Sequence, residues 1–166
     1  MSLRIEQIKP EDQRKVLDIV KHFWGDPMIV VHGSVFHTPE LRGLKAVINH
    51  NIVGISHFYI SDQVCEIITI ASLQQNKGIG SSLLDAVESL AASQKCRKLS
   101  VTTTNDNLNA LGFYQRQGFI LIRLHPGQMA KSRQIKPSIP LVGENDIPLR
   151  DELVLEKRIE TNHSID

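Results

Sequence analysis

A glycine-containing turn, a glutamate ahead of it and a tyrosine well downstream are the residues whose types and spacing could do chemistry together. The turn is Gln75-Asn76-Lys77-Gly78-Ile79-Gly80. It follows a short β-branched run at 64–71, typical of a buried strand, and precedes apolar residues at helical spacing. Where a helix begins after such a turn, its first N–H groups lack internal partners, and glycine lets an anion approach them. The turn therefore predicts a phosphate or pyrophosphate site.

Two familiar phosphate-binding motifs fit this turn poorly. A P-loop requires Lys followed by Ser or Thr after its last glycine, but Gly80 is followed by Ser81-Ser82. A dinucleotide-binding fingerprint requires a third small residue three positions after Gly80, where Leu83 stands. A nucleotide-binding protein is therefore only a weakly supported alternative.

A second segment downstream points in the same direction as the turn. It is Asn107-Leu108-Asn109-Ala110-Leu111-Gly112-Phe113-Tyr114, and it is closed by Gly118-Phe119. The turn resembles the Gln/Arg-x-x-Gly-x-Gly/Ala signature of the GNAT superfamily of acetyl-CoA-dependent N-acetyltransferases. The second segment resembles the Asn-x-x-Ala-x-x-x-Tyr helix of the same superfamily. The two matches stand in the family's order, and the resemblance covers residues 41–124.

The resemblance implies acetyl transfer from acetyl-CoA to a primary amine by direct attack, without a covalent enzyme intermediate. In such a reaction the amine must be neutral when it attacks, the oxyanion must be stabilised, and the departing thiolate must gain a proton. By its place in the strand before the turn, Glu66 is implied as the base. Tyr114 is implied as the residue that protonates the coenzyme thiolate.

Each of these two residues also has a structural interpretation. Glu66 is predicted to share a strand face with Val64, Ile68 and Ile70, where burial would raise the pKa of its carboxyl and so suit a base. Alternatively, it is an edge or salt-bridged residue that ends the buried part of the strand. Tyr114 is a sensible proton donor because a phenol has a pKa of about 10. Alternatively, it is a core residue that packs its helix onto the sheet.

The resemblance also implies where the coenzyme lies. The N–H groups from 75 to 80 would bind the pyrophosphate, with the helix dipole behind them. Ile70 and Ala71 would pair with pantetheine as an added strand and direct one N–H at the thioester carbonyl. Lys77 is a phosphate contact or an ordinary exposed lysine, and Asn107 is a pantetheine contact or only a helix cap. The implied coenzyme residues are Ile68, Thr69, Ile70, Gln75, Asn76, Lys77, Gly78, Ile79, Gly80, Ser81, Asn105, Asn107, Ala110 and Tyr114.

The acceptor is expected near Trp24, His32 and His37, together with Glu66; alternatively, the first three of these residues only pack against the fold or are exposed to solvent. GNAT proteins usually carry helices in this region, whereas residues 28–36 are predicted to be a bent extended segment broken at His32. The stretch at 125–150 is rich in proline, which forbids a long helix, and is predicted to be an ordered lid with a short helix near 129–135. Its basic residues are candidates for contact with an acidic acceptor or the ribose phosphate, or form a solvated face. They are Lys131, Arg133, Lys136 and Arg150.

Sequence periodicity predicts the elements that must position these residues. The predicted strands are 3–8, 44–48, 52–60, 64–71, 99–103, 119–124 and 153–159. Helices are predicted after Pro10, after the glycine turn and before Gly118. Parallel pairing is expected across the last two helices, because strand-helix-strand units cross over. The predicted fold class is α/β (α+β), a mixed central sheet of about six to seven strands flanked by helices.

The composition is that of an ordinary globular protein. The 166 residues suffice for one core, so one domain is expected at 1–160, with a polar tail at 161–166. A formal charge of +1 gives no general attraction to nucleic acid or to an anionic membrane. Cys65 and Cys96 have neither metal-ligand nor redox spacing, the seven histidines show no ligand pattern, and no metal is expected. Without a signal peptide or a membrane-spanning run, a cytoplasmic location is expected.

These observations predict a GNAT-like N-acetyltransferase that uses acetyl-CoA as cosubstrate and acts on a primary amine. A small-molecule acceptor is favoured, because the predicted lid would close over a compact acceptor. The alternatives are an acetyltransferase for protein amino termini and a non-catalytic acyl-CoA-binding or regulatory module. A homodimer is a further expectation, since an exposed strand near either end of the chain could pair with a second copy.

Overall fold

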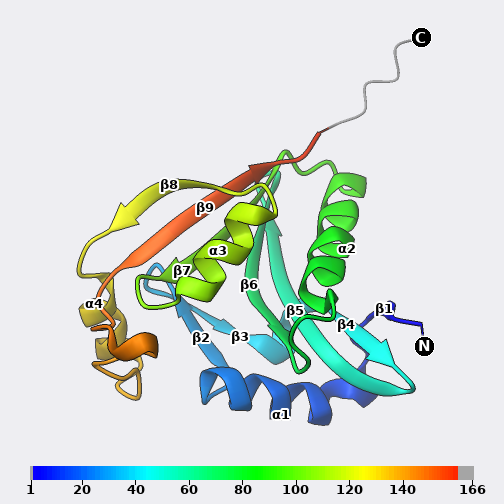
Figure 1. Cartoon of the computed structure of the whole chain (residues 1–166), viewed down its shortest axis with the longest axis horizontal. Coiled ribbons are helices and arrows are strands. Elements are labelled where there is room, and N and C mark those ends of the chain that lie inside the picture. Colours follow the sequence, from blue (N-terminus) through cyan, green and yellow to red (C-terminus); the bar gives the residue numbers. More distant parts are fainter. Residues whose placement is uncertain (1, 161–166) are drawn as a thin grey trace.

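A mixed sheet of seven strands forms the centre of the computed structural model, which describes residues 2–160 (Figure 1). The strand order is β1-β4-β5-β6-β7-β9-β8. The predicted fold class, a mixed sheet of six to seven strands flanked by helices, is confirmed; the predicted tail at 161–166 lies outside the described residues. The strands are β1 (Arg4–Gln7), β4 (Arg42–Ile48), β5 (Asn51–Ser61), β6 (Val64–Ser72), β7 (Lys98–Thr104), β8 (Ile120–His125) and β9 (Glu152–Arg158).

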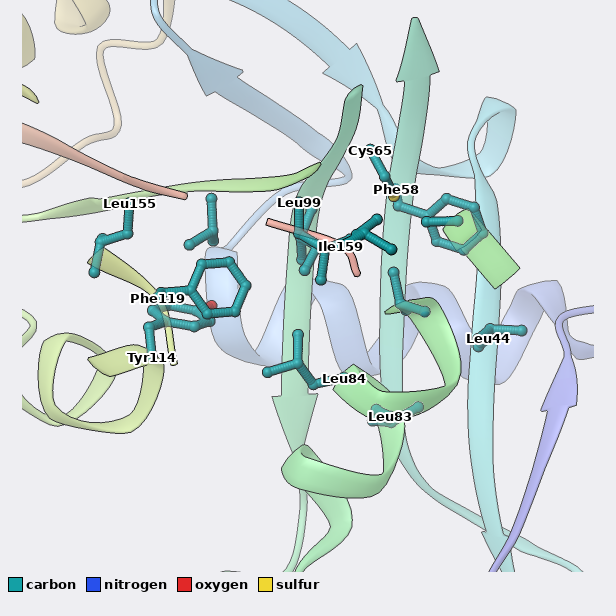
Figure 2. Packing of buried hydrophobic residues seen from close by; sticks show 14 of the residues in the cluster. Leu44, Phe58, Cys65, Leu83, Leu84, Leu99, Tyr114, Phe119, Leu155 and Ile159 are labelled. Atoms are coloured by element: carbon teal, nitrogen blue, oxygen red, sulfur yellow. The ribbon is translucent and has the colours of Figure 1, made fainter. Parts of the chain in front are cut away.

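Helices cover both faces of the sheet. Leu83 and Leu84 of α2 and Tyr114 of α3 belong to the main core on one face, where Figure 2 shows Tyr114 beside Phe119. Val16 and Val20 of α1 pack against the other face. The helices are α1 (Gln13–Trp24), α2 (Ile79–Ser93), α3 (Leu108–Arg116) and α4 (Gln128–Ile135), with short 3₁₀ turns at Pro10–Asp12, Thr38–Glu40 and Glu144–Asp146.

A small hairpin lies on the α1 face of the sheet. β2 (Met28–Val31) pairs antiparallel with β3 (Ser34–His37), and its apolar side chains pack against Ile68 of β6. The bent segment predicted from the sequence is thus a two-stranded hairpin. Its turn residues, His32 and Gly33, have φ values of 53° and 76°. Two successive positive φ values are what the twist of a two-residue hairpin turn requires.

The last strand is inserted between β7 and β8. β9 pairs antiparallel with both, so β7 and β8 run parallel to each other but are not paired. Parallel pairing is therefore confirmed across α2, where β6 meets β7, and is wrong across α3. The reason is that β9 carries buried Val154 and Leu155, whose side chains require the sheet interior. β8 is left at the sheet edge with Ile120 and Leu124 exposed, and pairing with a second copy stays a prediction.

An extra residue in β6 changes which face its side chains occupy. The pairing of β5 with β6 shifts register between His57 and Phe58, which leaves Ile68 without a cross-strand partner. Ile70 packs against the core under α2, whereas Ile68 packs against the hairpin. Alternation along β6 places Glu66 on the hairpin face with Ile68. The prediction that Glu66 and Ile70 share a face is therefore wrong, because the bulge interrupts strict alternation.

The segment between β8 and β9 is ordered and contains α4, close to the short helix predicted there. The Lys136 ammonium is buried and donates to the carbonyl oxygens of Trp24, at 3.2 Å, and Met28, at 2.8 Å. Arg133 donates to the carbonyl oxygen of Pro140 at 2.8 Å. These two basic side chains therefore hold the segment against the α1–β2 junction and against itself, rather than forming a solvated face.

Candidate active site

β6 and β7 separate at the bulge. They pair in parallel from Val64↔Lys98 to Ile67↔Val101, yet β6 continues to Ser72 and β7 to Thr104. Among the strands of residues 2–160, none pairs with the second half of β6 on its β7 side. Backbone groups exposed in this way can pair with an extended ligand. The predicted pantetheine contacts Ile68, Thr69, Ile70 and Ala71 all lie in this half of the strand.

The N-terminus of α2 follows this half of β6 after a short exposed turn. The first bond inside α2 runs from Ser82 N to Gly78 O at 3.0 Å, so the amides of Ile79, Gly80 and Ser81 precede the helical hydrogen-bond ladder. The helix dipole adds positive potential at this end. The predicted strand, turn and helix are confirmed, and the arrangement is suited to an anion.

The two glycines of the turn are required for different physical reasons. Gly78 has φ +71°, and the place where a Cβ would stand has nothing within 4 Å. At Gly80 a Cβ would lie 3.3 Å from Phe113 Cζ, so the missing side chain lets α3 approach α2. Gln117, next to the end of α3, adds a hydrogen bond from its Nε2 to Ser81 Oγ at 2.9 Å. The helix with Tyr114 is therefore held against the start of α2.

Glu66 is half-buried on the hairpin face of β6. Burial raises the pKa of Glu66, the nearby His32 imidazolium opposes that rise and the Glu152 carboxylate adds to it. Within residues 2–160, its carboxylate makes no hydrogen bond and no close ion pair. Glu66 is thus on a central strand and outside any salt bridge of the described chain. Its role as a base stays a prediction.

His32 reaches across the gap to β7 and β9. Its Nδ1 lies 3.1 Å from Glu152 Oε2, and its Nε2 lies 2.8 Å from Thr102 Oγ1. The ring also contacts His125 edge-on, with 5.3 Å between centroids. Glu152 is buried, whereas about a third of the His32 side chain (35%) is exposed. The Glu152 carboxylate beside the ring raises the pKa of His32.

Tyr114 lies on the opposite face of the sheet from Glu66, in the core beneath α3. Its ring makes edge contacts with Phe113 and Phe119. Burial raises the pKa of Tyr114 above the ordinary phenol value, so the hydroxyl keeps its proton at physiological pH. The position fits both interpretations of this residue, the core packing and the proton donor.

The predicted contacts before and within α3 also have structural partners. Asn107 caps α3, because its Oδ1 accepts from Ala110 N at 3.1 Å. Asn105 Oδ1 accepts from the backbone N–H groups of Arg150 and Asp151, and its Nδ2 donates to Pro148 O. The side chain of Asn105 therefore joins the end of β7 to the start of β9. The proposed coenzyme contacts of these asparagines stay predictions.

The candidate acceptor residues differ in their surroundings. Trp24 is half-buried between the α1 and hairpin clusters, and its carbonyl oxygen accepts from Lys136. His37 is exposed at the end of β3, opposite Met28 in the hairpin. Of the four residues predicted near the acceptor, only His32 and Glu66 are shown to interact electrostatically.

Glu152 and Thr102 are site residues that the sequence did not reveal. Glu152 is 120 positions from His32 in the chain, and no periodicity links the two. The one available signal was a carboxylate immediately before an apolar strand, since an acidic side chain at the buried end of a strand requires a partner.

Within residues 2–160, no three His, Cys, Asp or Glu side chains are placed to hold a metal ion. Cys65 and Cys96 are free thiols in the core, and burial raises the pKa of Cys65 to about 12. No helix between residues 2 and 160 has the length and apolar character needed to span a membrane.

Comparison with known proteins shows the family of this chain. A model of the acetyltransferase (GNAT) family matches residues 7–119. Two proteins of Bacillus subtilis strain 168 are each 39% identical: YxbD over 84% of this chain and 88% of its own length, and YdhI over 86% and 90%. This chain therefore belongs to the GNAT family of acetyltransferases.

Solved structures show the same fold. An IAA acetyltransferase from Bacillus cereus ATCC 14579 superposes with a TM-score of 0.72 at 23% identity, covering 95% of this chain and 99% of that one. A Bacillus subtilis acetyltransferase in complex with CoA gives 0.69 at 20% identity, covering 96% and 100%. A GNAT acetyltransferase from Elizabethkingia anophelis with acetyl-CoA bound gives 0.68 at 24% identity, covering 94% and 97%.

Proposed function

We propose that this protein transfers an acetyl group from acetyl-CoA to the primary amine of a small molecule by direct attack. Pantetheine would pair with β6 in the gap beside β7, and the pyrophosphate would bind the first amides of α2. Glu66 would take a proton from the acceptor nitrogen, and Tyr114 would protonate the departing thiolate. The observation that carries the proposal is the gap between β6 and β7, which ends at the free amides of α2.

The two candidate acid–base residues support direct transfer because they lie on opposite faces of the sheet. An acceptor that enters from the hairpin face would meet Glu66, while the thiolate leaves toward α3. A raised pKa makes Glu66 a stronger base than an exposed glutamate, and a protonated Tyr114 is available as a donor. These two residues would supply the base and the proton donor that aminolysis needs.

A small acceptor is favoured because ordered segments enclose the hairpin face of the sheet, from which the acceptor would enter. The hairpin tip reaches β9 through His32, and Lys136 holds the segment after β8 against the start of β2. A peptide amino terminus needs an open approach for several residues. The acceptor class therefore depends on this geometry.

The proposal is tested by titrating acetyl-CoA into the protein in a calorimeter, followed by an amine screen that measures free CoA thiol. We expect acetyl-CoA to bind and at least one small primary amine to release thiol. The Glu66→Gln variant should bind acetyl-CoA as the wild type does and lose about 100-fold or more in kcat. An unchanged rate in that variant would remove Glu66 as the base.

The same screen separates the alternatives. Turnover of peptides with free amino termini, without turnover of small amines, would show that the acceptor is a peptide amino terminus and not a small molecule. Binding of acetyl-CoA without turnover of any amine would favour a non-catalytic acyl-CoA-binding module. Tighter binding of ATP or NAD than of CoA would contradict the coenzyme assignment itself.

A further inference from the structure

The proposed reaction removes two protons from one nitrogen, so it has a use for a second base besides Glu66. A primary alkylamine is an ammonium ion near neutral pH, with a pKa close to the 10.4 of lysine. It must lose one proton before it can attack the thioester carbon. The tetrahedral adduct then carries a second surplus proton on nitrogen, which leaves as the C–S bond breaks and the thiolate is protonated. The net products are the amide, free CoA thiol and one proton released to water.

We propose that His32 takes the first of these protons from the acceptor ammonium, which leaves the second to Glu66. This inference rests on the proposed function and adds a residue to its site. The Thr102 hydroxyl would take the ammonium proton as it gives its own proton to Nε2 of His32, and the partly exposed ring would then release that proton to water. Glu66, more enclosed on β6, would act on the adduct.

The position of His32 is the first support. The hairpin tip lies on the same sheet face as Glu66, and His32 contacts Thr102 on β7, the residue directly after the last β6–β7 pair at Val101. His32 therefore stands over the start of the strand gap. Figure 1 shows the β2–β3 hairpin beside β7.

The fixed orientation of the ring is the second support. Glu152 interacts with His32 twice, through Nδ1 at 3.1 Å and through the backbone N–H, which is 3.4 Å from Oε1. With its proton on Nδ1, facing the carboxylate, the imidazole has Nε2 as its basic atom. A carboxylate that fixes the tautomer of a histidine and stabilises its imidazolium is the arrangement used by histidine bases elsewhere. Thr102 can donate its hydroxyl proton to Nε2 or accept one from it, so the contact persists in both states.

The charges around the ring favour a proton acceptor. Glu152 of β9 and Glu66 of β6 both stabilise the imidazolium, and Arg123 of β8 opposes it. His125 contacts the ring from the end of β8. The sum leaves the pKa of His32 raised, so it is a stronger base than a free imidazole.

The test compares two acceptors that differ in basicity but not in shape. The probes are the fastest primary alkylamine of the screen and its alkoxyamine isostere, in which oxygen replaces the carbon next to nitrogen and the nitrogen is uncharged at neutral pH. His32→Gln should lower kcat/KM for the alkylamine by about 100-fold at neutral pH. For the alkoxyamine, His32→Gln should lower kcat/KM by less than about threefold. For the alkylamine, the difference between wild type and variant should shrink as the pH approaches 10, because the amine is then increasingly neutral without a base. Glu152→Gln should move the acidic limb of the wild-type pH profile to lower pH.

His50→Gln is the matched control, because His50 is also an exposed histidine with positive φ in a hairpin turn, between β4 and β5. It should leave both rates unchanged. Equal losses with both probes in His32→Gln would show a structural role, and no loss with either would show no role; each overturns the inference. A wild type that binds acetyl-CoA but acetylates neither probe nor any other amine would instead overturn the proposed function.

Discussion

Tyr114 is the residue whose structural and chemical roles are hardest to separate by inspection. It is buried in the aromatic group beneath α3, and yet its neighbour Phe113 lies against the first turn of α2, where the coenzyme is proposed to bind. The hydroxyl contributes little to the packing of the ring. Removal of that one atom can therefore distinguish the roles.

Tyr114→Phe is expected to keep the fold and lose the chemistry. The ring contacts with Phe113 and Phe119 survive the change, so the free energy of unfolding should shift by less than about 1 kcal/mol. Without a proton donor for the thiolate, kcat should fall about 100-fold while acetyl-CoA affinity stays the same. Urea unfolding, calorimetry and thiol release measure the three quantities. A variant with full activity would leave only the core role.

Among the elements, the turn between β6 and α2 determines whether a coenzyme can bind. Gly78 is needed for its backbone conformation, whereas Gly80 is needed because a side chain there would press on Phe113. Exchanging each for alanine tests the two requirements independently.

Gly78→Ala should weaken acetyl-CoA binding more than Gly80→Ala does. An alanine at φ +71° costs about 1 kcal/mol, and its methyl group would occupy open space at the proposed pyrophosphate site, so we expect an affinity loss of about tenfold. Gly80→Ala presses on Phe113 and should cost stability with an affinity change below about threefold. Calorimetry and urea unfolding of both variants check the order, and the reverse order would argue against a pyrophosphate on these amides.

The elements also show what could be predicted from the sequence. The turn, the strand before it and the cap at Asn107 were predictable because each depends on residues close together in the chain. The bulge at Ile68 was not, since one unpaired residue leaves no trace in an alternating apolar pattern. The contact of His32 with Glu152 was equally hidden, because it depends on two elements that meet only in the folded sheet.

At the scale of the whole molecule, a buried histidine gives the stability a dependence on pH. His57 in the centre of the sheet is fully enclosed, and its Nδ1 lies 2.7 Å from Thr69 Oγ1. Burial lowers the pKa of His57 to about 4, from an ordinary value of 6.5. A depressed pKa means that the stabilising contribution is complete above pH 6.5 and is lost as the pH falls toward 4.

The wild type should therefore lose stability on acidification in a way that His57→Gln does not. Between pH 7 and pH 5, the free energy of unfolding of the wild type should fall by about 2 kcal/mol more than that of His57→Gln. His32, whose raised pKa acts in the opposite direction, is present in both proteins and cancels in the comparison. Urea unfolding at the two pH values measures the effect, with exposed His22→Gln as the control. Parallel slopes for wild type and His57→Gln would contradict it.

The insertion of β9 between β7 and β8 has a consequence for how the chain reaches its native state. Before β9 arrives, β7, α3 and β8 form a consecutive unit whose two parallel strands are free to pair directly with each other, as local connectivity favours. Such a pairing would have to be undone to admit the final strand. Since Glu152 stands at the start of β9, the histidine it orients has its partner only once β9 lies between β7 and β8.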